Sequence, residues 1–139
     1  MITNRSMPPG VIIPELAYPD VVAAATWLCH VLGFRERLRV GDHRVQLIYA
    51  GASIVVTERD DASHAADQAH AVMVHVADVD QHHAHALSNG ARILQPPTDH
   101  FYGERQYSLV DLGGHRWTFS QSIADVDPAD WGGIPGDAP

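Results

Sequence analysis

An internal repeat runs through the 139-residue sequence. Segment 11–20 is predicted to be a short apolar strand that ends at Pro19 and Asp20, and a run of helix-forming residues follows it and stops at Gly33. Segment 71–80 is again predicted to be an apolar strand that ends in Asp, and the helical run after it stops at Gly90. Each half of the chain therefore begins with a strand followed by a helix.

Three further strand candidates follow the helix in each half. They are RERLRV, HRVQLIYA and SIVVTE in the first half, and ARILQ, QYSLV and RWTFSQ in the second. The polar stretch RDDASHAADQ between the halves has the composition of a connecting loop. We therefore predict an α+β chain with a flexible N-terminus (1–10), a first βαβββ module (11–58), a linker (59–70), a second βαβββ module (71–122) and a Pro/Gly/Asp-rich tail (123–139).

A single βαβββ module cannot bury both faces of its sheet, because its one helix covers one face and leaves the other exposed. Pairing two such modules, within a chain or across a dimer, turns the exposed faces toward each other around a cleft. We expect this cleft to be the functional site.

The composition excludes several classes of function. The formal net charge of -8 repels phosphate backbones, and no apolar run approaches the roughly 20 residues that span a membrane. The N-terminal sequence lacks the apolar core of a signal peptide, and the single cysteine, Cys29, fits a reducing compartment. We expect a cytoplasmic protein with no nucleic acid and no membrane as partner.

The sequence resembles the vicinal oxygen chelate superfamily, which includes glyoxalase I, extradiol dioxygenases and bleomycin-resistance proteins. The resemblance covers about residues 11–122. It is carried by the LGF that ends the first helix, by VADVD and NGA in the second module, and by YGER and DLGGHRWTF at its end. It implies two βαβββ modules that enclose a cleft, and a homodimer in which the modules of one chain meet each other or are exchanged between chains.

In metal-dependent members of this superfamily, four ligands, usually His, Gln or Glu, lie on the first and last strands of the two modules. The corresponding positions here are Ile13, Val55, Ala71 and Thr118. A divalent transition metal needs three or four N, O or S ligands, which these side chains do not supply. The resemblance therefore implies a metal-free member, and we expect no cofactor.

Strand alternation supports the same positions, because successive side chains point to opposite faces of a sheet. Valines at alternate positions of 71–76 suit the helix side, as do Trp117 and Phe119 in the last strand. In the last strand of the first module, the position that corresponds to the family ligand is uncertain by one or two residues, so Thr57 and Glu58 are candidates as well as Val55. The cleft-facing residues of the second module are then Ala71, Met73, His75, Arg116, Thr118 and Ser120.

Glu15 and His75 are the candidate catalytic residues. Glu15 lies two residues after Ile13 and His75 four residues after Ala71, so both side chains are expected to point to the cleft, as those of Ile13 and Ala71 do. Three roles stay open for the two side chains. They could form a general acid/base pair, orient a ligand by hydrogen bonds, or form a structural ion pair.

The segment PPTDHFYGER at 96–105 is predicted to be a loop that acts as a wall or lid of the cleft. Phe101 and Tyr102 could stack on a planar ligand there, and Arg105 could bind an anionic group. In the alternative interpretation the loop packs its aromatic side chains on its own module.

The histidines of the second helix and of the last turn are predicted to have no special role. His82 and His85 share one helix face, which is interpreted as solvated. His115 follows DLGG as an ordinary polar turn residue.

We therefore expect a metal-free protein that binds a small aromatic or polycyclic metabolite or antibiotic in the cleft, as bleomycin-resistance proteins sequester theirs, and that is not an enzyme. Two alternatives stay open. One is a metal-dependent lyase, isomerase or dioxygenase with a displaced ligand set that uses Glu15, His75 and either Glu58 or His70. The other is a metal-free enzyme of secondary metabolism in which Glu15 and His75 transfer protons.

Overall fold

The computed structural model describes residues 3–60 and 70–137. The chain divides into two compact units, and their described parts are 3–60, 70 and 111–115 for the first unit, and 71–110 and 116–137 for the second. Most of the predicted linker, at 61–69, lies outside the described residues, as do residues 1–2 and 138–139.

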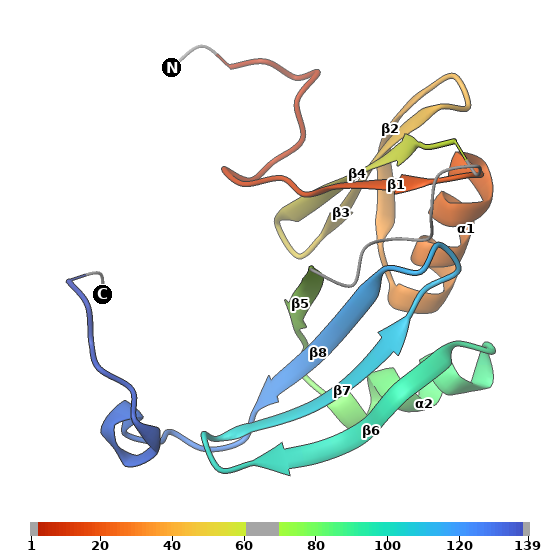
Figure 1. Cartoon of the computed structure of the whole chain (residues 1–139). Helices are drawn as coiled ribbons and strands as arrows, with labels where there is room; N and C mark the ends of the chain where they lie inside the picture. The colour runs from red at the N-terminus through yellow and green to blue at the C-terminus, as the bar shows by residue number, and fades with distance from the viewer. Residues whose placement is uncertain (1–2, 61–69, 138–139) are drawn as a thin grey trace. The chain divides into compact units, whose positions relative to one another are not determined.

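The first unit contains one helix and one four-stranded sheet (Figure 1). Strand β1 pairs in parallel with β4, and the remaining pairs are antiparallel in the order β1-β4-β3-β2. The elements are β1 (Glu15–Tyr18), α1 (Val21–Leu32), β2 (Arg35–Val40), β3 (Arg44–Tyr49) and β4 (Ala52–Glu58).

The second unit repeats this arrangement, with the sheet order β5-β8-β7-β6 and a parallel pair formed by β5 and β8. Two βαβββ modules in tandem are thereby confirmed. The elements are β5 (Ala71–His75), α2 (Val79–Ser88), β6 (Arg92–His100), β7 (Glu104–Val110) and β8 (Arg116–Ser122), followed by the short helical turn η1 (Pro128–Trp131).

Each helix packs on one face of its own sheet, and the core of each unit lies between them (Figure 1). In the first unit α1 packs against β3, and Leu28 of α1 and Val45 and Leu47 of β3 are fully buried. In the second unit the fully buried Trp117 and Phe119 project from β8 toward α2. Burying such a side chain contributes about 1.5–3 kcal/mol. No helix of the described chain is long and apolar enough to cross a bilayer.

Both helices begin at an aspartate that caps the first turn. The Asp20 carboxylate accepts a hydrogen bond of 3.0 Å from the backbone N–H of Ala23, and the Asp78 carboxylate accepts one of 3.0 Å from that of Gln81. Such a cap satisfies a backbone donor that the helix itself leaves without a partner. Asp20, which ends the first predicted strand, therefore starts α1, whereas α2 starts at Asp78, two residues before the predicted strand end at Asp80.

The Asp20→Ala variant is expected to lower the free energy of unfolding by about 1 kcal/mol, because it leaves the first-turn N–H groups of α1 without the side-chain acceptor. Urea denaturation measures the change. The Asp20→Asn variant keeps an acceptor oxygen and should stay within a few tenths of a kcal/mol of the parent chain. An equal loss in both variants would show that charge, and not the cap, is responsible.

The first strand starts later than the sequence predicts. It begins at Glu15, while Val11 and Ile12 are 102% and 86% exposed. The reason is Pro14, which has no N–H to donate to a neighbouring strand. Its carbonyl still accepts a hydrogen bond of 2.9 Å from the N–H of Val55, so the pairing with β4 starts there.

Segment 96–105 is a strand pair and a tight turn, so its prediction as a loop is wrong. β6 continues through Pro96 and Pro97 to His100, and only 101–103 form the turn before β7. β6 is an edge strand, and its register with β7 shifts between Gln95 and Thr98. Prolines are tolerated in such a place because an edge and a bulge leave N–H groups that pair with no neighbouring strand.

The interpretation of His82 as part of a solvated helix face is also wrong. Its Nδ1 lies 2.5 Å from the hydroxyl of Tyr107, and its ring centroid lies 4.2 Å from that of Phe119. His82 is therefore half-buried and packs between α2 and the sheet of the second unit. His85, in contrast, is exposed.

The loop at 111–115 belongs to the first unit, where it is joined to β1 by a group of side chains that we call the loop cluster: Tyr18, Asp111 and His115. The Tyr18 hydroxyl donates a hydrogen bond of 2.6 Å to Oδ2 of Asp111, and the backbone N–H groups of Gly113 and His115 each donate one of 2.9 Å to Oδ1. Nε2 of His115 donates a hydrogen bond of 2.8 Å to the carbonyl of Ala17.

Burial dominates the electrostatics of the loop cluster. Burial, and then the charge of Asp111, raise the pKa of the Tyr18 phenol far above its usual range, so the hydroxyl stays a donor. His115 is 5% exposed and therefore part of the interior, which differs from the ordinary turn residue that the sequence indicates.

Candidate functional site

Each sheet carries its helix on one face, and we call the opposite face the open face. A hollow lies on the open face of each unit, and each hollow is lined only by residues of its own unit. The candidate functional site is therefore described as two separate hollows.

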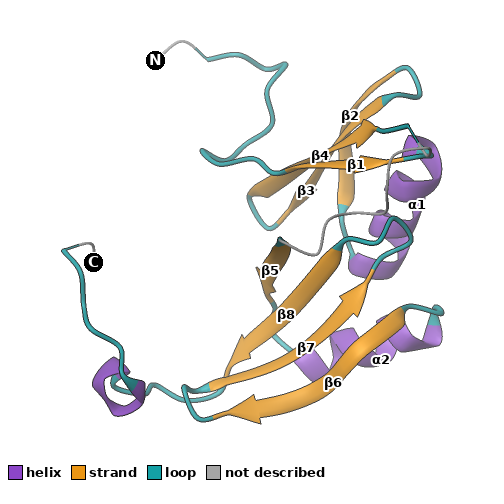
Figure 2. Ribbon diagram, viewed as in Figure 1, coloured by secondary structure: helices purple, strands orange, loops and turns teal. Residues whose placement is uncertain are grey.

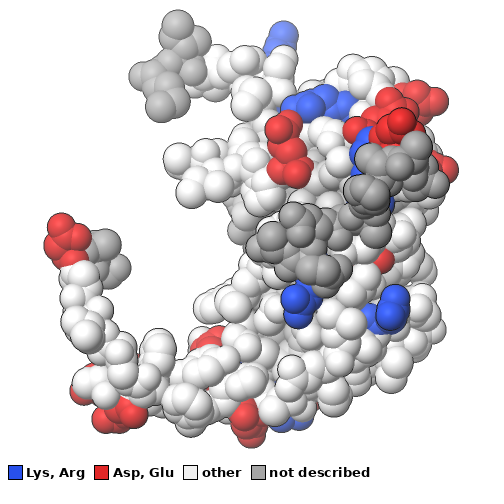
Figure 3. Space-filling model, viewed as in Figure 1, with Lys and Arg blue, Asp and Glu red and all other residues white. Residues whose placement is uncertain are grey.

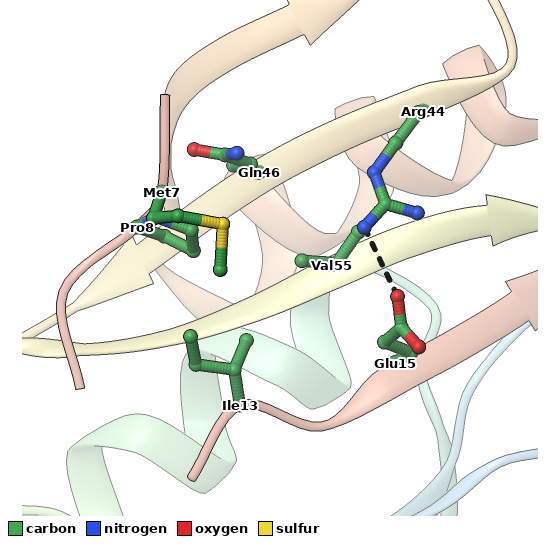
Figure 4. Close-up of a pocket in the computed structure, with 7 residues that line it drawn as sticks. All are labelled: Met7, Pro8, Ile13, Glu15, Arg44, Gln46 and Val55. Atoms are coloured by element: carbon green, nitrogen blue, oxygen red, sulfur yellow. Dashed lines mark hydrogen bonds and ion pairs between the residues drawn. The ribbon is translucent and has the colours of Figure 1, made fainter. Parts of the chain in front are cut away.

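The first-unit hollow has a volume of about 150 Å³ (Figure 4). β1 and β4 run in parallel with Glu15 beside Val55, and β3 places Gln46 beside Val55 on the other side. These three residues share one face because paired residues of neighbouring strands point the same way. The hollow is lined by Met7, Pro8, Ile13, Glu15, Arg44, Gln46 and Val55, so the structure brings together the predicted residues Ile13, Glu15 and Val55.

Glu15 is held by an ion pair inside this hollow. Its Oε1 lies 3.0 Å from Nη2 of Arg44 on β3, as the dashed line in Figure 4 shows. Both side chains are well exposed, so the pair contributes little to stability. Of the three roles considered for Glu15, the arrangement favours the structural ion pair, with Arg44 rather than His75 as its partner.

The N-terminal segment covers the first-unit hollow. Gln46 Nε2 donates a hydrogen bond of 2.8 Å to the carbonyl of Ser6, and Arg37 Nη2 donates one of 2.8 Å to that of Arg5. Pro8 is buried, and Val55 is only 3% exposed although it points to the open face. The chain itself thus occupies much of this face, which leaves a small space for a ligand.

The second-unit hollow is larger, at about 390 Å³. The register places Gln106 of β7 and His75 of β5 on either side of Ser120 of β8, so all three share the open face. The hollow is lined by Met73, His75, Tyr102, Glu104, Gln106, Ser120 and Trp131, of which Met73, His75, Tyr102 and Ser120 were predicted from the sequence.

A chain of hydrogen bonds forms the polar floor of this hollow. The Tyr102 hydroxyl donates to Oε1 of Gln106 at 3.1 Å, and Nε2 of Gln106 donates to the Ser120 hydroxyl at 3.0 Å. The Ser120 hydroxyl donates to Oε1 of Glu104 at 2.6 Å. Hydrogen bonds from Ser120, and then from Ser122, hold the pKa of the Glu104 carboxyl below its usual value, because they favour the charged form.

His75 lies at the edge of this floor. Its Nε2 is 3.8 Å from Oε1 of Glu104, which is beyond hydrogen-bond distance, and its side chain is 74% exposed. The carboxylate that faces His75 is therefore Glu104 of its own unit.

The C-terminal segment forms one wall of the second-unit hollow. The backbone N–H groups of Ile123 and Ala124 donate to the carbonyl of Gly103 at 2.9 and 3.3 Å, which holds the segment beside the β6–β7 turn. η1 follows, shown as a short helical turn in Figure 2, and it places the Trp131 ring 5.7 Å from that of Tyr102.

The remaining predicted residues lie outside the two hollows. Thr57, Ala71, Arg116 and Thr118 belong to the open faces by their register but line neither hollow. Phe101 is 77% exposed at the turn.

Arg105 is on the helix side of its sheet, so the structure does not bring it to the predicted anion site. Its guanidinium pairs with Asp80 of α2 at 3.0 Å and with Asp99 of β6 at 2.9 Å. Alternation along β7 is the cause, because Glu104 and Gln106 on either side of Arg105 take the open face.

The sequence interpretation missed Glu104, Gln106 and Trp131 as residues of the hollow. The alternation of side chains along β7, followed back from QYSLV to Glu104, places Glu104 and Gln106 on the same face and is the signal that identifies both. Trp131 carries no such signal, because it lies outside the repeat in the Pro/Gly/Asp-rich tail.

The residues at the four family metal positions do not fit a metal ion. Ile13, Val55 and Ala71 carry no donor atom and Thr118 carries one hydroxyl, whereas a transition metal needs three or four donors. Within 3–60 and 70–137, no group of three or more His, Cys, Asp or Glu side chains that could hold a metal ion is found.

Comparisons with known proteins agree on one family. Residues 11–119 match the model of the Glyoxalase/Bleomycin resistance protein/Dioxygenase superfamily. No curated protein matches the chain significantly.

Among solved structures, TioX from Micromonospora sp. ML1 is 35% identical, with a TM-score of 0.68 over 81% of this chain and 98% of that one. The fosfomycin resistance protein FosX from Listeria monocytogenes is 16% identical, with a TM-score of 0.67 over 84% and 95% of the two chains. Hypothetical protein SA1046 from S. aureus is 19% identical, with a TM-score of 0.68 over 79% and 92%. With a family model that spans both repeated modules and a relative of this identity over most of its length, the chain belongs to the glyoxalase/bleomycin resistance protein/dioxygenase superfamily.

Proposed function

We propose that this protein binds and sequesters a small aromatic or polycyclic molecule, such as a metabolite or an antibiotic, on the open face of its second unit, without a metal ion. The single observation that carries the proposal is the second-unit hollow, in which a methionine and two aromatic rings surround one hydrogen-bonded polar floor.

The size and lining of the hollow suit such a ligand. Pockets for small molecules measure about 300–1,000 Å³ and are mostly apolar with a few placed polar groups. The second-unit hollow, at about 390 Å³, falls in this range. Met73 is 61% exposed at its edge and Trp131 45%, so apolar surface is available for a flat ring to cover.

The lowered pKa of Glu104 favours ligand binding over proton transfer as the role of the second-unit hollow. A general base works best when its pKa lies near the working pH. The hydrogen bonds from Ser120 and Ser122 move the pKa of Glu104 the opposite way, below its usual value, which weakens it as a base. Glu15 pairs with Arg44 in the other hollow, so each of the two candidate catalytic residues faces a charged or chargeable group of its own unit.

The test is a titration of protein purified without an affinity tag and dialysed against EDTA, using planar antibiotics and aromatic metabolites with fluorescence or calorimetric detection. We expect at least one compound to bind, with the same affinity before and after EDTA treatment. Stoichiometric zinc, nickel, iron or manganese that survives dialysis, found by elemental analysis, would contradict the metal-free part of the proposal.

The Met73→Glu variant is expected to weaken binding of such a compound by a factor of about ten or more, because it adds a second carboxylate to the hollow that Glu104 lines and removes apolar contact. Leu87→Glu is the matched control, since Leu87 is 55% exposed on α2, on the helix side of the same unit. Equal loss in the two variants would place the ligand elsewhere.

A further inference from the structure

The hydrogen bonds on the floor of the second-unit hollow all run in one direction. The proton of Tyr102 points to Gln106, that of Gln106 to Ser120, and that of Ser120 to Glu104. The hydroxyl protons of Tyr102 and Ser120 and one N–H of Gln106 are therefore already used by the next residue, and the chain ends on Glu104.

Glu104 keeps acceptor capacity at this end. An ionised carboxylate offers about four lone-pair sites and no donor. Here Ser120 and Ser122 use part of that capacity, and His75 at 3.8 Å lies too far away to use more. A ligand over this floor is therefore matched when it donates a hydrogen bond to Glu104.

The wall over this floor belongs to a segment beyond the family match. The superfamily model ends at residue 119, whereas Trp131 lies in the C-terminal segment that Gly103 anchors. Trp131 is 45% exposed and tilted at 51° to Tyr102, so its ring leaves room beside that of Tyr102 for another ring.

Acidic side chains extend along the same segment. Asp125, Asp127 and Asp130 precede Trp131, and the sequence after Ala124 holds no basic residue. Figure 3 shows the acidic groups of this segment without basic groups among them. The surroundings of the hollow thus favour ligand groups that donate hydrogen bonds and disfavour anions.

We propose that the second-unit hollow selects planar aromatic ligands that carry an N–H or O–H donor, which bonds to Glu104 while the ring stacks on Trp131. This inference rests on the proposed function and specifies its ligand class. Trp131 and Glu104 are then the residues that determine affinity and selectivity.

The test uses indole and benzofuran, two bicyclic probes of almost the same shape in which a ring N–H is replaced by a ring oxygen. Their dissociation constants for the full chain are measured by NMR titration. We expect indole to bind about tenfold more tightly, which corresponds to about 1.4 kcal/mol, because only indole donates a hydrogen bond to the charged carboxylate.

Two variants separate the donor effect from the stacking effect. Glu104→Gln should reduce the indole preference to about twofold or less, because it removes the charge and introduces a competing donor. Trp131→Ala should weaken both probes by about fivefold and leave their ratio unchanged, because each loses the same stacking contact. Ile134→Ala, in the same segment and 91% exposed, is the control and should change neither constant.

The outcomes distinguish this inference from the proposed function. Equal binding of the two probes that is lost in Met73→Glu would overturn the donor selectivity and keep the binding site. Unchanged affinities in Trp131→Ala would overturn the role of the C-terminal segment. Binding of neither probe at millimolar concentration would overturn the inference, whereas the proposed function is overturned when none of the planar antibiotics and aromatic metabolites binds.

Discussion

The Asp111→Ala variant is expected to lose about 4 kcal/mol of unfolding free energy, a larger loss than any other single substitution proposed for the first unit. The Asp111 carboxylate accepts hydrogen bonds from the Tyr18 hydroxyl and from the backbone N–H groups of Gly113 and His115. Removing a partner leaves a buried donor with its full desolvation penalty, about 1–3 kcal/mol for each group. Denaturation in urea, followed by circular dichroism, measures the loss.

Two further variants show which part of the loop cluster carries the effect. Tyr18→Phe removes one of the three donors and keeps the ring, so we expect a loss of about 1.5 kcal/mol. Asp42→Ala changes an exposed aspartate of the β2–β3 turn and should stay within about 0.5 kcal/mol of the parent chain. If Asp111→Ala cost no more than Asp42→Ala, the loop at 111–115 would not be held to β1 as the structure indicates.

The repeat was predictable because its signals are local. Asp20 and Gly33 cap the two ends of α1 as predicted, and each acts on backbone groups within a few residues. For α2 the signal is displaced by one or two residues, because the caps are Asp78 and Asn89 rather than Asp80 and Gly90. The alternation of apolar side chains in 71–75 also predicts which side chains reach the open face, and the exposed Met73 and His75 lie there.

The loop cluster was not predictable, because it joins residues far apart in the sequence. Tyr18 and Asp111 are 93 positions apart, and neither carries a pattern that points to the other. A polar residue after a glycine pair resembles many surface turns. Only the tertiary structure shows that His115 of this turn is buried against β1.

The candidate site was predictable in part. The alternation of side chains along a strand identified Glu15 and His75, and the family resemblance identified Val55. The register of β7 decides that Glu104 rather than Arg105 lies beside His75. The prolines of segment 96–105 favour a loop, and a loop does not predict to which face of a sheet the residues after it point. The position of Trp131 depends on the hydrogen bonds that join the C-terminal segment to Gly103. These bonds are between backbone groups, so no pattern of side chains in the sequence predicts them.

The Gly103→Ala variant is expected to detach the C-terminal segment from the β6–β7 turn, and so to weaken ligand binding by about fivefold, as Trp131→Ala does. A Cβ at this position would lie 2.4 Å from the carbonyl oxygen of Ala124, and the φ of +89° adds strain for any residue with a side chain. Ala124 must move away, which breaks the hydrogen bonds to the Gly103 carbonyl. We expect an unfolding free energy lower by about 3 kcal/mol.

Gly90→Ala separates the detachment from the conformational strain. Gly90 has a φ of +81° in the same unit, and a Cβ there meets nothing within 4 Å, so this variant carries the strain without the clash. It should cost about 1–2 kcal/mol and leave ligand affinity unchanged. Limited proteolysis with chymotrypsin, read by mass spectrometry, should show faster cleavage at Trp131 in Gly103→Ala alone. Equal cleavage and equal affinity in the two variants would mean that the segment is not anchored at Gly103, and that the ligand does not depend on the wall it forms.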